Sequence, residues 1–555
     1  MMSRLRFALL LVGLSISSCS TVLADGRQSA LTSAGKRGEG DSTGTGKKKT
    51  QPNPSRKGLG TITVGKETTY VTGPIDKDGY VDYAAALNER LRHGVTPENN
   101  ATVLLWQAIG PRPEGGKGMP AAFFKWMGMA APPEEGAYFI DLGRYAKERN
   151  KREPDERSEK LSEHLDRAVQ RRWTAQMYPV LAGWLRANDK PLALVVEATR
   201  RSHYFSPLTP PPEGKGPLLN ALLPGVQKCR ALAQALLARA MLRLGEGKRD
   251  AAWQDLCACH RLARFVGRGA TLIESLVAIA IDIIASRADL AFMEDSGVGG
   301  RQLEKCLREL ESLPPLPSVA DKVELGERFT FLDNVTWLDQ FGVSYLETLA
   351  RGEAPDKHRE RDRVLEGIDW NPALRNINKL YDRLAAALRE NDRAMRQKKL
   401  QDIENDLEEL KKRGPGQWSQ IEIFLAGDSA AGVRGKYIGD VLMALMVPAV
   451  SKVERAADLA RQVEANLHVA FALAWYRREH GHYPNELAVL APNYLKKIPH
   501  DLFSGTPLIY RPKKDGYLFY SVGQNGKDEG GRWFDDTPPG DDLAVRMPLP
   551  EPRRK

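Results

Sequence analysis

The chain has 555 residues, of which 42% are hydrophobic and 27% are charged, as in an ordinary globular protein. Its mean hydropathy of −0.42 and the lack of any apolar run long enough to cross a bilayer exclude a multi-span membrane protein. The length allows about two to four domains. The 81 Lys and Arg residues exceed the 71 Asp and Glu residues, and this net charge of +10 suggests an anionic partner such as a nucleic acid.

Residues 1–24 have the pattern of a secretory signal peptide. Arg4 and Arg6 precede an apolar stretch that is too short to span a membrane, and small residues follow it. Cleavage after Ala24 would release a soluble exported protein. The segment that ends at Cys19 resembles a bacterial lipobox, and processing there would leave Cys19 as a lipidated first residue. We therefore expect export to the periplasm or cell envelope, with a lipid anchor as the open alternative.

Residues 25–60 predict a disordered basic linker. They contain Gly, Ser, Thr, Lys and Pro but almost no large apolar side chain, so they bury too little surface to offset the entropy of ordering. Eight Lys or Arg residues against three Asp or Glu residues place half of the net charge in this segment. The rest of the chain is close to neutral. The main argument for a nucleic-acid partner is thereby lost, and we expect none.

The segment 61–150 predicts an N-terminal mixed region. Asp82 can cap a helix at 83–92, and a second helix is expected at 99–108. The Pro- and Gly-rich stretch 110–135 is expected to be irregular.

The region 151–435 predicts a helical domain. Apolar residues recur at helical spacing in segments separated by Gly and Pro. Helices are expected at 165–178, 179–187, 191–201, 218–244, 250–265, 271–293 and 325–349. Within 384–412, Leu400, Ile403, Leu407 and Leu410 have the spacing of a short coiled coil or helical hairpin.

The chain contains none of the common catalytic motifs: no G-x-S-x-G, no H-E-x-x-H, no Walker A sequence, and no G-x-G-x-x-G after a strand. Cys257-Ala-Cys-His260 lies in a helical pattern and lacks zinc-site spacing, so its cysteines are expected to be buried. His480 and His482 flank Gly481 at a helix end, where a structural role is expected. No catalytic residue is predicted.

Carboxylates on apolar helices are a further group of interest. Glu197, Glu274 and Asp282 are expected to be buried, and buried acids usually pair with a cation. The sequence offers Arg201, Arg264 and Arg287 as partners for them.

The pattern changes again over 436–547, which predicts a separate small module. A long helix is expected at 453–479, followed by two short strands joined by a hairpin turn and then by a loop rich in Gly and Asp. The strands are placed at 508–511 and 516–522, with the turn between them at 512–515. The loop follows at 523–542, and the final tail at 548–555.

Three segments of this module resemble the major pseudopilins of type II secretion. They are Tyr476-Arg-Arg-Glu-His-Gly-His-Tyr-Pro484, Pro499-His-Asp-Leu-Phe503 and Tyr520-Ser-Val-Gly-Gln-Asn-Gly-Lys527. The resemblance covers about a fifth of the chain and implies a pilin-like fold. A pseudopilin begins with its long helix, whereas this helix lies deep in the chain, so assembly as an ordinary pilus subunit is not expected. The whole layout also looks like that of exported proteins common in planctomycete-type bacteria, which implies no activity.

In pseudopilins, the loop after the last hairpin can bind calcium through a serine, backbone oxygens and aspartates. Carried over to this chain, the resemblance implies a calcium site at Ser521, Asn525, Asp528, Asp541 and Asp542. The alternative is that these are solvated loop residues and that Asn525-Gly526 forms a turn. No other cofactor is expected.

The sequence thus predicts a mainly α protein, with a large helical bundle or helical-hairpin region followed by a small α+β pilin-like module. Two functions remain open. The first is an exported cell-envelope protein with a non-catalytic binding or scaffolding role, with envelope proteins or cell-wall components as partners. The second is an exported hydrolase of an unrecognised family, with its site in the helical region. A deep pocket that combines carboxylates, or a histidine with an acid, would favour the hydrolase.

Overall fold

The computed structural model describes residues 60–113, 118–149, 155–209, 216–221, 223–342, 345, 367–413, 439 and 448–551. The predicted signal peptide, Cys19, nearly all of the basic linker and the last four residues of the tail lie outside these ranges.

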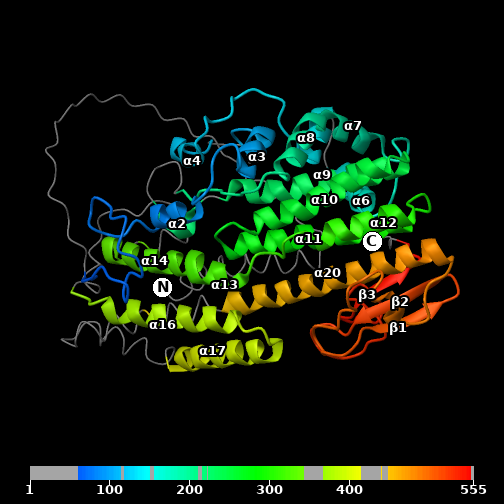
Figure 1. Ribbon diagram of the computed structural model, residues 1–555. Coiled ribbons are helices and arrows are strands. Elements are labelled where there is room, and N and C mark those ends of the chain that lie inside the picture. Colours follow the sequence, from blue (N-terminus) through cyan, green and yellow to red (C-terminus); the bar gives the residue numbers. More distant parts are fainter. Residues whose placement is uncertain are drawn as a thin grey trace.

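The described chain is mainly helical, as expected, with a small antiparallel sheet near the C-terminus (Figure 1). The first α-helices are α2 (Tyr83–Leu91), α3 (Ala101–Ile109), α4 (Ala121–Met127), α5 (Leu142–Arg149), α6 (Asp155–Ala168), α7 (Pro179–Ala187) and α8 (Asp189–Ala198). The later ones are α9 (Pro224–Gly245), α10 (Arg249–Val266), α11 (Leu272–Glu294), α12 (Gly300–Glu311), α13 (Val319–Asp321), α14 (Arg328–Phe341), α16 (Asn371–Leu388), α17 (Arg393–Arg413) and α20 (Pro448–His480). Short non-α turns are η1 (Leu218–Asn220), η2 (Lys322–Glu327) and η4 (Leu487–Leu490).

Local signals determine where several helices begin. Asp82 accepts a hydrogen bond from the Ala85 backbone N–H at the start of α2, as predicted. Thr271 and Glu274 form a reciprocal capping box at the start of α11. Glu274 is buried, as expected, but its carboxylate caps a helix, and no arginine of the described residues pairs with it.

Two sequence predictions were wrong at the level of local structure. The helix expected at 165–178 ends at Ala168, because Trp173 turns into the core, where its indole N–H donates to the Ala238 carbonyl. The stretch 110–135 contains α4, whose Phe123 and Phe124 pack on Trp106. The segment 384–412, for which a short coiled coil or a helical hairpin was predicted, spans the end of α16 and most of α17, and these two helices are in contact.

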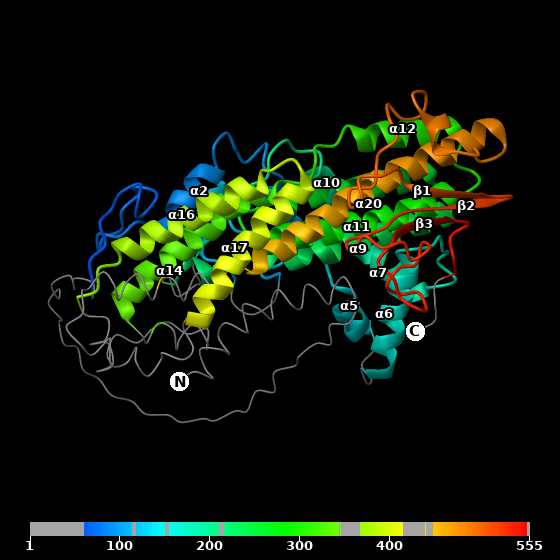
Figure 2. The same ribbon diagram turned by 90° about the horizontal axis from the view of Figure 1, so that it is seen from below.

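The main bundle consists of α9, α10 and α11, with α20 lying against α11 and α12 (Figures 1 and 2). Buried alanines on α9 and α10, such as Ala240 and Ala258, let these helices approach closely. The same hydrophobic core continues through α20 into the sheet, where Phe519 and Val545 belong to it. The C-terminal module and the helical bundle are therefore packed around a common core.

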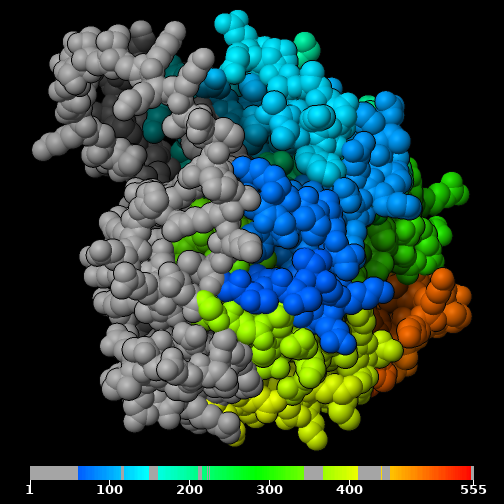
Figure 3. Space-filling view, turned by 90° about the vertical axis from the view of Figure 1, so that its left-hand side faces the viewer, coloured from blue at the N-terminus to red at the C-terminus, as the bar shows by residue number. Residues whose placement is uncertain are grey.

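A second hydrophobic core lies under α2, α14, α16 and α17. It includes Leu400, Ile403 and Leu407, so these three positions of the predicted apolar seam are buried, and the side chain of Leu410 lies outside the described residues. Figure 3 shows the N-terminal part of the described chain, in blue, against the helices coloured yellow-green. Gly60 is attached there, because its backbone N–H donates to Asp339 of α14 at 2.6 Å.

The sheet has the order β1-β2-β3, with β1 at Ile509–Lys513, β2 at Gly516–Ser521 and β3 at Leu543–Met547. All neighbours are antiparallel, and Lys513 pairs with Gly516, so β1 continues further into the predicted turn than expected. The third strand was not predicted. It alternates between buried and half-buried residues and pairs with β2 across the loop 523–542.

The long helix α20 joins the sheet to the bundle. Four buried polar residues recur along it at intervals of four, namely Glu454, Asp458, Gln462 and Asn466. The two acids pair with arginines that include Arg396 of α17. Gln462 accepts from the Leu502 backbone N–H, in the turn before β1, and Asn466 donates to the Leu543 carbonyl of β3. Within the described ranges, no helix has both the length and the apolar composition that a membrane crossing requires.

Candidate functional site

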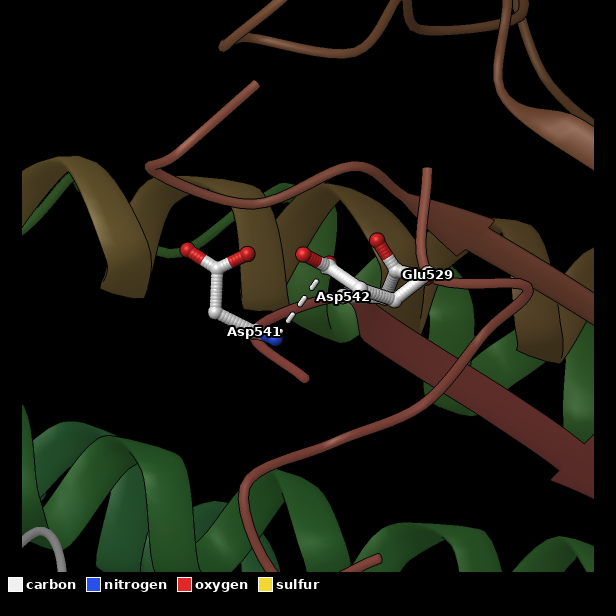
Figure 4. A group of neighbouring side chains, drawn as sticks. All are labelled: Glu529, Asp541 and Asp542. Atoms are coloured by element: carbon white, nitrogen blue, oxygen red, sulfur yellow. Dashed lines mark hydrogen bonds between the residues drawn. The ribbon is translucent and has the colours of Figure 1, made fainter. Parts of the chain in front are cut away.

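The loop between β2 and β3 brings three carboxylates together. Glu529, Asp541 and Asp542 each offer an oxygen, and these oxygens lie within 4.8 Å of one another (Figure 4). The Asp541 backbone N–H donates to Glu529 and so holds the two ends of the loop together. Asp542 is fully buried, whereas Glu529 and Asp541 are half-buried.

Two oxygens of this carboxylate cluster lack a hydrogen-bond partner. Asp541 Oδ1 and Asp542 Oδ1 are both buried and unpaired among the described residues. The other Asp542 oxygen accepts from the Gly531 backbone N–H at 2.7 Å. An unpaired buried carboxylate oxygen is costly, so it indicates a missing proton, water or cation.

The pKa values of the carboxyl groups in this cluster reflect their burial and their close approach to one another. Burial, together with the charge of Glu529, raises the pKa of Asp542 to about 6. Burial likewise raises the pKa of Asp541. Burial alone would raise the pKa of Glu529, but hydrogen bonds from Asn525 and from the Asp541 backbone lower it. Acids this close to one another are destabilised as anions unless a cation joins them.

The cluster fits a calcium ion. Calcium takes 6 to 8 oxygens at about 2.3–2.6 Å, so two of its ligand oxygens lie up to about 5 Å apart. The observed limit of 4.8 Å is within this range. Three carboxylates can supply three to six oxygens, depending on how many bind through both atoms, and water can complete the shell.

The five residues that the resemblance implied have different positions. Asp541 and Asp542 belong to the carboxylate cluster. Asn525 borders it, because its side-chain amide donates to Glu529 and its backbone N–H donates to Asp541. Asp528 lies apart and accepts from the Tyr520 hydroxyl and the Gly530 backbone.

Ser521 serves a different contact. It is buried, and its hydroxyl donates to Asp501 at 2.7 Å. Asp501 also accepts from the backbone N–H groups of Val522 and Phe503, so this aspartate ties the base of the loop to the preceding turn.

Sequence reasoning missed Glu529. Its neighbour Asp528 was chosen instead, and nothing local distinguishes two adjacent acids in a loop. The difference arises from the chain path, which returns through Gly540 to Asp541 and faces Glu529.

A second cluster combines a histidine with acids, but it lies inside the protein. His260 of α10 contacts Asp282 and Asp289 of α11 through its two ring nitrogens, at 2.7 and 2.8 Å. Arg264 bridges Asp282 to Glu464 of α20 at 2.5 and 2.6 Å. His260 is 2% exposed and Asp289 is 0% exposed.

The electrostatics of this buried cluster are those of an internal salt bridge. Burial alone would lower the pKa of His260, but the charges of Asp289 and Asp282 raise it to about 10. Burial would raise the pKa of Asp282, but His260 and Arg264 lower it to about 2. The prediction that Asp282 pairs with Arg264 is confirmed, whereas Glu197 is exposed and the expectation of its burial was wrong.

The cysteines are structural as far as the described residues show. Cys229, Cys257, Cys259 and Cys306 are free and buried, as predicted for Cys257 and Cys259. Burial raises the pKa of the Cys257 thiol to about 11, which leaves it protonated and unreactive at neutral pH.

Two concavities on the described surface contain no catalytic pair of side chains. One is an open apolar depression over α4 that includes Phe124 and Met129. The other is small and contains Asp339. That carboxylate is already bonded to the Gly60 backbone, the Trp370 indole and the Tyr80 hydroxyl.

Comparison of the chain with models of protein families, with curated proteins and with solved structures found no match.

Proposed function

We propose that this protein is an exported cell-envelope protein with a non-catalytic binding or scaffolding role, and that Ca²⁺ at Glu529, Asp541 and Asp542 orders its C-terminal loop. The observation that carries the proposal is the pair of unpaired buried oxygens, Asp541 Oδ1 and Asp542 Oδ1, beside a third carboxylate. Such an arrangement fits a cation better than it fits a reacting substrate, since Asp542 is fully buried.

The non-catalytic part of the proposal is supported by how the other acids are used. The cluster of His260 with Asp282 and Asp289 lies between α10, α11 and α20, and all three side chains are buried, so a substrate does not contact them. Asp339, the carboxylate in a surface concavity, has hydrogen bonds to both oxygens. The hydrolase alternative therefore has no observation in its favour.

The arrangement of the chain supports a role for the C-terminal module in contacting a partner. Residue 60 lies beside α14 and α16 at one end of the bundle, and the sheet lies at the other end (Figure 1). A protein held to the envelope through its N-terminus would thus present the sheet and the loop 523–542 away from the attachment point.

The calcium part is tested by thermal unfolding of the full chain, first treated with chelator and then titrated with CaCl₂. Ligand that binds only the folded state stabilises it by about 2.7 kcal/mol at a hundredfold excess over Kd. We expect the midpoint to rise with calcium in the wild type but not in Glu529→Gln or Asp542→Asn. Asp515→Asn is the matched control, because Asp515 is an exposed acid in the β1–β2 turn. Equal responses of all four proteins, or none in the wild type, would refute the site.

Export is tested separately by cell fractionation and by the intact mass of the mature protein. Cleavage after Ala24 and lipidation at Cys19 give different masses. A cytoplasmic protein that keeps its first residues would contradict the envelope role without affecting the calcium test.

A further inference from the structure

Two exposed histidines lie at the end of α20, and neighbouring residues determine which ring nitrogen of each histidine carries the proton. His480 is the last residue of the helix, and Gly481 at φ +79° turns the chain so that His482 follows on the same side of the molecule. The centres of the two imidazole rings are 6.4 Å apart. Both rings contact Tyr476, at 4.1 and 5.9 Å between centres.

The protonated nitrogen of His480 follows from its hydrogen bonds. The Tyr494 hydroxyl donates its proton to Glu479 at 2.6 Å, so the Tyr494 oxygen can only accept from the His480 Nε2 at 3.0 Å. The Trp475 indole N–H holds the second oxygen of Glu479 at 2.8 Å. His480 in its neutral form thus carries the proton on Nε2, which leaves the lone pair of Nδ1 free.

The same reasoning applies to His482 with the opposite nitrogen. Its Nδ1 lies 2.9 Å from the backbone carbonyl of Tyr483, and a carbonyl can only accept. Nδ1 therefore carries the proton and the lone pair of Nε2 is free. Tyr483 is held in place by Arg477, whose guanidinium lies 4.8 Å from the ring centre and donates to the hydroxyl. Neither free nitrogen has a partner among the described residues.

This is the arrangement that protein metal sites use to orient histidine ligands. A ligating imidazole typically donates its other N–H to a carboxylate, a backbone carbonyl or water, which fixes its tautomer and makes the free nitrogen more basic. Here the Tyr494 hydroxyl, which donates to Glu479, accepts from His480. The Tyr483 carbonyl accepts from His482. An ion bound about 2.0–2.1 Å from each nitrogen places two imidazole centres about 5 to 6 Å apart. The observed separation of 6.4 Å is slightly larger than this range, and both side chains are exposed.

We propose that His480 and His482 form an open binding site for a divalent late transition-metal ion such as Zn²⁺. Imidazole nitrogen suits such ions, whereas Ca²⁺ prefers oxygen, so this site is chemically distinct from the carboxylate cluster on the β2–β3 loop. Two histidines fill two of four tetrahedral positions. Water or a group from another molecule takes the others.

The test is calorimetric titration of the chelator-treated full chain with ZnCl₂, in a Glu529→Gln background so that zinc at the carboxylate cluster is not counted. We expect one zinc per chain, and we expect its binding to be lost in the double variant His480→Ala/His482→Ala. That variant keeps all the buried cysteines, so the lost heat can be assigned to the histidines. His500→Ala, which removes another exposed histidine of the same module, should bind zinc normally.

Tyr494→Phe separates a metal site from a structural contact. It keeps the ring that packs on Trp475 at 4.7 Å and removes only the hydroxyl that accepts from His480. Loss of such a supporting hydrogen bond weakens metal binding about 10- to 100-fold. We expect this loss with unchanged circular dichroism. Zinc binding that persists in the double histidine variant, or that is absent from the Glu529→Gln protein, would overturn the proposal.

Discussion

His260 is expected to be essential for stability because it is the cation that pairs with Asp289 in a buried charge cluster. Its two ring nitrogens bind Asp282 and Asp289, and Asp289 has no other hydrogen-bond partner in the described chain. In His260→Phe, Asp282 keeps Arg264, but Asp289 remains as a buried carboxylate without a cation. Breaking a buried ion pair from one side costs about 3–5 kcal/mol.

His468 provides a matched control in the same interface. It lies on α20, and its Nε2 is buried without a hydrogen-bond partner. Burial lowers the pKa of His468 to about 4, so the ring is neutral at pH 7. His468→Phe removes an unsatisfied polar atom and no ion pair. We therefore expect a change in stability within about 1 kcal/mol, in either direction.

The assay is urea unfolding at pH 7, followed by far-ultraviolet circular dichroism, for the wild type, both single variants and His260→Phe/Asp289→Leu. The double variant removes the orphaned charge and should recover much of the stability that His260→Phe loses. Equal costs for His260→Phe and His468→Phe would show that loss of ring packing, rather than loss of charge, sets the effect. Failure of the double variant to recover any stability would refute the role assigned to Asp289.

Two further predictions concern pH and backbone packing. The pKa of His468 is lowered from 6.5 to about 4 on folding, so the unfolded chain takes up this proton first as the pH falls. The contribution of His468 should therefore lower the stability by up to about 3 kcal/mol between pH 6.5 and pH 4. Urea midpoints at pH 7 and pH 4.5 should show a smaller fall for His468→Phe than for the wild type, and an equal fall would contradict this. Gly326→Ala should destabilise by more than about 2 kcal/mol, because its Cβ would lie 1.9 Å from the Ala270 carbonyl oxygen. Gly143→Ala, where a Cβ meets nothing within 4 Å, should be neutral or slightly stabilising in the same urea assay, and similar results for the two alanine variants would be inconsistent with the packing at Gly326.

Much of the helical architecture could be predicted from the sequence because its signals are local. Asp82 and Thr271 mark helix starts because each side chain accepts a hydrogen bond from the backbone N–H three residues further along. The helix expected at 250–265 was found as α10, with one extra residue at each end. The burial of Cys257 and Cys259 also followed from their helical spacing.

The incorrect predictions involve contacts between residues that are far apart in the sequence. The strand β3 pairs with β2 only after a long loop returns, and its five residues have no strong strand signal of their own. The helix predicted through Trp173 stops early because that indole finds its partner on α9, 65 residues further along the chain. Neither contact could be predicted from the residues next to it in the sequence.

Only part of the candidate site could be predicted from the sequence. The sequence, with its pseudopilin resemblance, indicated an acidic loop and two of its ligands, Asp541 and Asp542. It did not indicate Glu529, because the choice between adjacent acids depends on how the loop closes. It paired Asp282 with Arg264 correctly, but the contacts of His260 with both aspartates required α10 and α11 to be packed.

The sequence by itself determined the mainly helical class, the capped helix ends and the near-neutral charge outside the N-terminal segment, because composition and short-range hydrogen bonding decide these properties. Only the tertiary structure decided that the long C-terminal helix shares a core with the bundle and contributes Glu464 to a buried charge cluster. It also decided that three loop acids meet, and that two histidines present free nitrogens. These features depend on atoms brought together from separate elements, and only the folded arrangement specifies those distances.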